Sequence, residues 1–137
     1  MNTLLWLDDM RRPFTGTWVD DYSPIDTSNI VVEWVKSYDE FTKWINRNGL
    51  PTAICFDHDL GKLTEKELLS QGYSKQEARK RKGEEKSGYD CAKWLVEYCM
   101  DNEVDVPKYN VQSSNPAGRD NILGLLDNYH KVFTTRQ

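Results

Sequence analysis

Three consecutive ionisable residues, Asp57, His58 and Asp59, stand where a strand is expected to end. They follow an apolar, partly β-branched run at residues 52–56, which comes after a Gly-Leu-Pro turn signal. This pattern is typical of a buried strand. Two carboxylates and an imidazole at the end of an interior strand are costly to desolvate unless they are paired or bound to a cation. The pattern therefore favours a functional site, and the alternative is an acidic surface loop beginning at Asp57.

The first strand of the chain is expected to end in the same way. The apolar run at residues 4–7 is followed directly by Asp8 and Asp9. A further strand-like run at residues 109–112 is followed by smaller polar side chains: Ser113, Ser114 and Asn115. Because ligands of open α/β sheets bind at the carboxyl ends of the strands, we expect all of these residues at one edge of one sheet.

Asp8, Asp9 and Asp57 would repel one another at that edge unless a cation lay among them. Carboxylate oxygens suit Mg²⁺, which binds one or two carboxylates together with waters and a substrate phosphate. We therefore expect Mg²⁺, with Asp59 as a further ligand or as a support for the others. Including His58 would widen the choice to Mn²⁺ or another transition metal. His58 could instead point away from the site and pack against the fold.

The same edge carries residues suited to a phosphate group. Pro116 is expected to open a helix capped by Asn115 or Ser114, and the first turn of that helix offers free backbone N–H groups to an anion. Arginine can bind phosphate oxygens through two N–H groups, and serine can donate one hydrogen bond. The candidate phosphate-binding residues are Arg11, Arg12, Ser113, Ser114, Asn115 and Arg119. His130 has no partner that the sequence identifies, and we expect it on the surface.

Strands and helices alternate along the chain, which is typical of a parallel sheet covered by helices. Strands are expected at residues 4–7, 30–36, 52–56 and 109–112, with a short fifth strand at 132–134. Helices are expected at residues 38–48, at 89–101 and from 116 onward, and residues 10–29 should form a loop. The predicted fold class is α/β, a three-layer sandwich with a mostly parallel sheet, in a single domain of residues 1–137.

Residues 62–87 differ in composition from the rest of the chain. They include eight basic and five acidic residues and few apolar ones. Capping-box spacings that begin at Thr64 and Ser74 predict two short helices. We expect a charged helical arm inserted after the third strand, and the alternative is a solvated helix pair without a specific task.

The bulk composition limits the class of protein. The chain has 137 residues and a net charge of −4, which argues against bulk DNA binding. Its three cysteines form no C-x-x-C pair, and no signal peptide is recognised, so we expect reduced thiols in the core of a cytoplasmic protein. No apolar run approaches the roughly 18 residues of a membrane span, so no membrane partner is expected.

The acids and hydroxyl groups at the strand ends resemble those of the receiver domains of bacterial two-component signalling, which have a flavodoxin-like sheet. The sequence is more similar to a divergent group, the cyclic-phosphate processing receiver domains. This resemblance rests on four segments: LWLDDMRRP at residues 5–13, FDHDLG at 56–61, KSGYDCAKWL at 86–95 and SSNPAGRDNI at 113–122. Compared with ordinary receivers, a loop replaces the first helix, the charged arm is added, and no lysine follows a clear fifth strand.

The resemblance implies a metal-dependent enzyme that acts on nucleotides or RNA ends bearing cyclic phosphates. In this hypothesis Asp8, Asp9 and Asp57 bind the metal, and the catalytic residues are Asp57, His58 and Asp59. His58, placed between two acids, could give or take a proton near neutral pH. Two alternatives stay open: a receiver-type signalling module phosphorylated on Asp57, and a module that binds a nucleotide or a protein without catalysis. The sequence favours no particular oligomeric state.

Overall fold

The computed structural model of the protein describes residues 2–60, 65–70, 72–81 and 86–136. The strands are β1 (Asn2–Leu7), β2 (Ile30–Val35), β3 (Ala53–Phe56) and β4 (Lys108–Val111). The helices are α1 (Trp18–Tyr22), α2 (Tyr38–Asn48), α3 (Glu65–Ser70), α4 (Lys75–Arg81), α5 (Gly88–Asp101) and α6 (Pro116–Thr135). None of these helices combines the length and the apolar composition needed to cross a lipid bilayer.

The four strands form one parallel sheet in the order β2-β1-β3-β4. The chain runs from β1 outward to β2 and then crosses back to place β3 on the other side of β1. Such a reversal of direction opens the crevice in which α/β sheets bind ligands. The α/β fold class expected from the sequence is confirmed, and the crevice lies at the carboxyl ends of β1 and β3.

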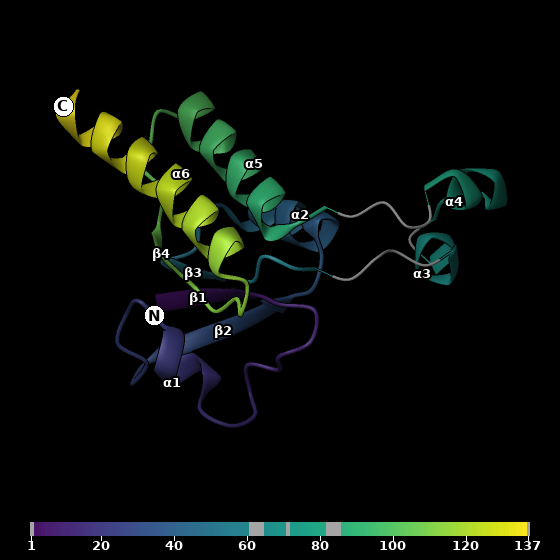
Figure 1. Cartoon of the computed structure of the whole chain (residues 1–137), viewed down its shortest axis with the longest axis horizontal. Helices are drawn as coiled ribbons and strands as arrows, with labels where there is room; N and C mark the ends of the chain where they lie inside the picture. Colours follow the sequence, from purple (N-terminus) through teal and green to yellow (C-terminus); the bar gives the residue numbers. More distant parts are fainter. Residues whose placement is uncertain (1, 61–64, 71, 82–85, 137) are drawn as a thin grey trace.

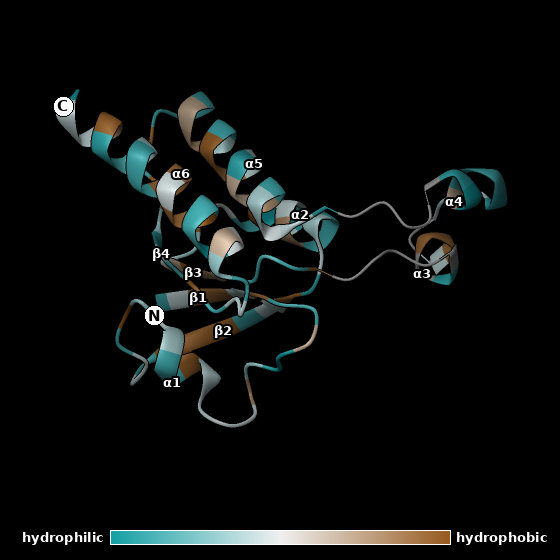
Figure 2. Ribbon diagram, in the orientation of Figure 1, coloured by the Kyte–Doolittle hydropathy of each residue, from teal (hydrophilic) through white to brown (hydrophobic). Residues whose placement is uncertain are grey.

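Each face of the sheet has its own apolar cluster, because successive side chains of a strand point to opposite faces. The face covered by α2, α5 and α6 buries one alternate set of β1 and β3 residues: Leu5, Leu7, Ile54 and Phe56. The face covered by α1 and its flanking residues buries the other set: Leu4, Trp6, Ala53 and Cys55. Figure 1 shows these three layers, and Figure 2 shows hydrophobic residues on the strands and along parts of α5 and α6.

Side-chain caps set the starts of α2 and α5. Ser37 accepts a hydrogen bond from the backbone N–H of Glu40 (3.1 Å) at the start of α2. Ser87 and Asp90 form a reciprocal capping box at the start of α5. This helix begins at Gly88, one residue earlier than expected. A cap of this kind stabilises a helix by about 1 kcal/mol, so both starts are specified locally.

Two expectations about the secondary structure are wrong. Residues 132–134 belong to α6 rather than to a fifth strand. The apolar helical spacing continues through this segment, and the rings of Tyr129 and Phe133 pack with centroids 6.0 Å apart. Residues 10–29 are not wholly irregular, because Trp18–Tyr22 form the five-residue helix α1. A helix this short leaves no detectable period in the sequence.

The segment between β3 and α5 contains two short helices, α3 and α4, as its capping-box spacings predict. They pack on each other, and Leu68 and Ala78 are buried there. Figure 1 shows the pair standing apart from the sheet and the other helices. The expected cap Ser74 accepts a hydrogen bond from the N–H of Glu77 (3.2 Å), whereas the expected cap Thr64 lies outside the described residues.

Other polar and thiol side chains serve the fold. The three cysteines are free and buried, and burial raises the pKa of the Cys55 and Cys99 thiols to about 12. They therefore fill the core in the protonated form, as expected. His130 has a partner that the sequence did not identify, because its Nδ1 lies 2.5 Å from Oδ2 of Asp105. This pair links α6 to the connection that precedes β4.

Two glycines let helices approach the end of β3 closely. The N–H of Gly88 donates to the carbonyl oxygen of His58 (2.8 Å), and a Cβ at position 88 would lie 1.8 Å from the carbonyl oxygen of Asp57. A Cβ at Gly118 would lie 2.3 Å from Cγ of the His58 ring. Any larger residue would therefore push α5 or α6 away from this end of the sheet.

We predict that Gly88→Ala destabilises the fold by about 2–3 kcal/mol, because the new methyl group overlaps backbone atoms that cannot move freely. The matched control is Gly124→Ala in α6, where a Cβ would meet no atom within 4 Å. This change should stabilise the protein by roughly 0.5–1 kcal/mol, since alanine loses less backbone entropy in a helix. Urea unfolding measures both variants. Equal stability of Gly88→Ala and the wild type would contradict the close approach.

Candidate functional site

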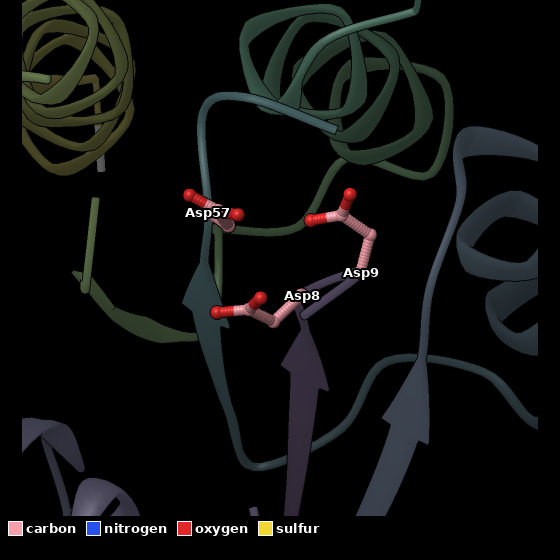
Figure 3. A group of neighbouring side chains, drawn as sticks. All are labelled: Asp8, Asp9 and Asp57. Carbon is pink, nitrogen blue, oxygen red and sulfur yellow. The ribbon is translucent and has the colours of Figure 1, made fainter. Parts of the chain in front are cut away.

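The three candidate metal ligands meet at the carboxyl ends of β1 and β3. Asp8 follows directly on β1, Asp9 comes next, and Asp57 follows directly on β3. Each offers one carboxylate oxygen, and these oxygens all lie within 4.8 Å of one another. Figure 3 shows the three side chains gathered at the two strand ends. We call them the acidic cluster, and ion binding by it stays a prediction.

Asp8 is fully buried, and its hydrogen bonds shape the loop that follows β1. Its Oδ1 accepts from the backbone N–H groups of Met10 (2.9 Å) and Arg11 (2.8 Å). Its Oδ2 accepts a longer hydrogen bond from Nε2 of Gln112 (3.4 Å), which also donates to the carbonyl oxygen of Leu7 (3.0 Å). These bonds replace the water that Asp8 loses on burial, and they fix its carboxylate in place.

Arg11 supplies positive charge to the acidic cluster from within the chain. Its Nη1 lies 3.2 Å from Oδ2 of Asp8 and 3.8 Å from Oδ1 of Asp57. Its carbonyl oxygen accepts a hydrogen bond from Nε1 of Trp6 (2.9 Å), so its backbone is held as well. The cluster therefore already attracts one cationic group, which is the behaviour expected of a cation site.

The carboxyl group of Asp57 has a pKa above its ordinary value. Burial, followed by the nearby charge of Asp8, raises the pKa of its carboxyl from 3.8 to about 7. The guanidinium of Arg11 opposes this rise, and the charges of Asp9 and Asp59 add to it. Near neutral pH a cation would compete with a proton for Asp57, so metal affinity should increase as the pH rises through about 7.

A cavity of about 490 Å³ opens over the acidic cluster. Its lining residues are Asp9, Met10, Arg11, Asp57, Asp59, Leu60 and Ser114. They come from the segments that follow β1, β3 and β4, so three strand ends contribute to one cavity. A ligand in this cavity would meet carboxylates, a guanidinium and a hydroxyl group together.

Asp59 lines the cavity and is paired with His58. Nδ1 of His58 lies 2.9 Å from Oδ1 of Asp59, and Oδ2 of Asp59 accepts from Nδ2 of Asn115 (3.5 Å). The His58 ring packs against Gly118 in the first turn of α6. Within the described residues, His58 itself does not line the cavity. The catalytic role of His58 stays a prediction. Its contacts with Asp59 and Gly118 are suited to holding the Asp59 carboxylate in one orientation.

The turn between β4 and α6 holds three of the candidate phosphate-binding residues. Asn115 caps α6 by accepting from the N–H of Gly118 (3.1 Å), and Oγ of Ser113 accepts from the N–H of Asn115 (3.1 Å). Ser114 is exposed and lines the cavity. Ser114 is therefore placed to meet a phosphate, whereas the side chains of Ser113 and Asn115 build the turn.

The structure does not bring Arg119 to the cavity. Its Nη1 donates to the carbonyl oxygen of Val111 and lies 3.5 Å from Oδ1 of Asn110, which also accepts from the N–H of Val111 (2.8 Å). These contacts satisfy backbone groups of β4 that face away from the sheet. Because β4 is an edge strand, Arg119 covers part of the sheet edge. Arg12 is exposed on the loop after β1 and likewise lies outside the described lining of the cavity.

Three residues that support the site were not predicted from the sequence. Gln112 bonds Asp8, Nε1 of Trp6 bonds the loop after β1, and Nε1 of Trp34 donates to the carbonyl oxygen of Asp8 (2.8 Å). A tryptophan in a strand is also common in an ordinary hydrophobic core. The sequence pattern therefore does not distinguish Trp6 and Trp34 from core residues without a role at the site. The usable signal is chemical, because a buried indole N–H needs an acceptor.

The family model of the cyclic-phosphate processing receiver domain matches residues 3–128. The match covers β1 from its second residue, the other three strands and every residue of the acidic cluster. The chain belongs to this family. No curated protein and no solved structure shows a significant match. The name of the family links the chain to cyclic-phosphate processing.

We predict that Asp57→Asn stabilises the metal-free protein at high pH. Folding raises the pKa of Asp57 to about 7, so the contribution of this group to stability is greatest below pH 4 and is lost as the pH rises through about 7. At pH 8 the variant should unfold with a free energy about 1–3 kcal/mol above that of the wild type. At pH 5 the difference should shrink. Urea unfolding with a chelator present measures this.

Asp101→Asn is the control, because Asp101 is exposed at the end of α5. It should change stability little at either pH. An Asp57→Asn effect equal at pH 5 and pH 8 would show that the native Asp57 is not held under electrostatic strain.

Proposed function

We propose that this domain is a metal-dependent phosphoesterase that hydrolyses cyclic phosphates on nucleotides or RNA ends. One observation carries the proposal: three carboxylates converge within 4.8 Å beside a cavity that also presents a guanidinium and a hydroxyl group. Carboxylates suit a divalent cation, and the guanidinium and hydroxyl suit a phosphate. Family membership supports the choice of cyclic phosphates.

The donor set fits Mg²⁺ best and also accepts Mn²⁺, because Asp8, Asp9 and Asp57 offer only hard oxygen atoms. The approach of Arg11 to two of these acids supports the fit, since it shows where positive charge is favourable. A bound divalent ion would polarise a phosphoryl oxygen and make a water molecule more acidic.

The residues of the chain itself would position the phosphate. Arg11 can turn its guanidinium from the carboxylates to phosphate oxygens when a divalent ion takes over their charge. Ser114 also lines the cavity and can donate its hydroxyl hydrogen there. Together they would stabilise the negative charge that develops on the phosphoryl oxygens during the reaction.

Hydrolysis of a cyclic phosphodiester adds one water molecule across one ester bond. The water oxygen forms a bond to phosphorus, one P–O ester bond breaks, and a proton ends on the leaving oxygen. Asp59 lines the cavity and is paired with His58, so these two residues are the candidates for moving that proton. In this arrangement Asp59 contacts the substrate, and His58 positions the Asp59 carboxylate.

The test is a panel of 2′,3′-cyclic nucleotides, cyclic-phosphate RNA ends and cyclic dinucleotides, each with Mg²⁺, with Mn²⁺ and with a chelator. We expect metal-dependent formation of a phosphomonoester by the wild type. Asp8→Asn and Asp57→Asn should each lower kcat/KM at least about 100-fold, because each removes a charged ligand and its electrostatic contribution.

Asp101→Asn serves again as the matched control and should keep wild-type activity. Absence of turnover under every condition would reject the enzyme. If the Asp57→Asn variant then still bound the ligand, the result would support a non-catalytic binding module in place of the enzyme. Stable phosphorylation of Asp57 by a small phosphodonor would instead support a signalling receiver.

We predict opposite effects of Arg11→Ala on the two ligands. Loss of the guanidinium should raise KM for the cyclic phosphate about 10- to 100-fold, as expected for removal of a charge-assisted hydrogen bond. The same change should tighten Mg²⁺ or Mn²⁺ binding, because a competing cation leaves Asp8 and Asp57. Calorimetry measures the metal affinity, and Arg47→Ala on the exposed side of α2 is the control. Weaker metal binding by Arg11→Ala would contradict this competition.

A further inference from the structure

Three exposed apolar side chains lie in the loop after Asp9 and at the first residue of α1. Met10 is 79% exposed, Phe14 is 70% exposed and Trp18 is 37% exposed. Single exposed apolar residues are ordinary on a protein surface. Three of them between residues 10 and 18, the first of which lines the cavity, form a candidate binding surface. We call these three residues the apolar loop surface.

The loop is held in a defined conformation. The N–H groups of Met10 and Arg11 donate to Oδ1 of Asp8, and the carbonyl oxygen of Arg11 accepts from the indole of Trp6. At the far end of the loop, Trp18 stacks on the ring of the last residue of α1, with centroids 6.3 Å apart. Side chains on an ordered loop have less freedom to lose when a ligand binds, so they are well suited to recognition.

Met10 and Trp18 connect the apolar loop surface to the cavity. Met10 lines the cavity directly. Cζ of Arg11 lies 5.3 Å from the ring centroid of Trp18, while Nη1 of the same guanidinium lies 3.8 Å from Oδ1 of Asp57. One arginine therefore spans the distance from the acidic cluster to an exposed indole. A ligand that fills both places has an anionic group and, close to it, a flat apolar part.

We propose that the apolar loop surface binds the base of a nucleotide whose phosphate lies in the cavity. This inference rests on the proposed function and adds the place at which the base of the nucleotide binds. Indole and guanidinium planes both stack on bases. Every base has a π-face, so the surface selects for a base without reading its identity, and purines bind more tightly than pyrimidines because they cover more area.

A protein partner fits these observations less well. A protein-docking surface has no need to share Met10 and Arg11 with a cavity that is lined by acids. A nucleotide needs this connection, because its phosphate and its base are joined through one sugar.

The test compares adenosine 2′,3′-cyclic phosphate with glycerol 1,2-cyclic phosphate, which has the same five-membered ring and no base. The wild type should show the higher kcat/KM with the nucleotide. Trp18→Ala should lower the ratio of the two kcat/KM values about 10-fold or more, in line with the loss of a stacking platform. Phe14→Ala and Met10→Ala should lower it less, and Trp18→Phe should restore much of it.

Met100→Ala is the matched control for Met10→Ala. Met100 is 60% exposed on α5 and does not line the cavity over the acidic cluster, so the ratio should not change. Phe14→Ala alters a largely exposed side chain, and it keeps the test decisive if Trp18→Ala unfolds.

The outcomes separate this inference from the proposed function. Hydrolysis of both compounds with the same ratio in the wild type and in all the loop variants would overturn the base site and leave the phosphoesterase intact.

If neither compound is hydrolysed, calorimetry of adenosine 3′-monophosphate and glycerol 2-phosphate with Mg²⁺ decides whether the base site exists. Tighter nucleotide binding that is lost in Trp18→Ala supports the base site, and equal binding of the two compounds overturns it. Loop variants that change only self-association would identify a protein contact and also overturn it.

Discussion

The structure depends on holding two like charges together at the ends of adjacent strands. Parallel pairing sets Leu7 of β1 beside Phe56 of β3, so the residues that follow them, Asp8 and Asp57, must be neighbours. Backbone N–H groups, Gln112 and the guanidinium of Arg11 offset part of the cost of burying Asp8. The pKa of Asp57 is raised by the burial of its own carboxyl group and, next, by the charge of Asp8 beside it. Such a contact lowers stability, and local costs of this kind are typical of functional sites.

The sequence predicts the position of the acidic cluster well, because it requires only the strand ends to be recognised. Apolar runs followed by acids mark the ends of β1 and β3, and a parallel sheet brings such ends to one edge. The capped starts of α2 and α5 are also readable, since Ser37 and Ser87 act on their own helices. These features are local or follow from topology, and neither kind depends on the direction of a distant side chain.

The direction of long side chains is the part that the sequence does not predict. Residues 132–134 continue α6, so within the described residues the sheet ends at β4, and that edge exposes the carbonyl oxygen of Val111. Arg119 is drawn to this oxygen instead of to the cavity. His58 likewise fills the space left by Gly118. In both cases a competing partner from another element decides the outcome, and residue spacing carries no information about that competition.

The hydrogen bond between His58 and Gly88 also joins the two points at which the chain leaves the end of β3 and enters α5. The entropy lost on closing a loop between two fixed points grows slowly, by about 0.6 kcal/mol for each doubling of its length. The fold can therefore accommodate segments of very different size between these points. This junction is a natural place for evolution to vary the family, and for an engineer to graft a foreign peptide beside the cavity without rebuilding the sheet.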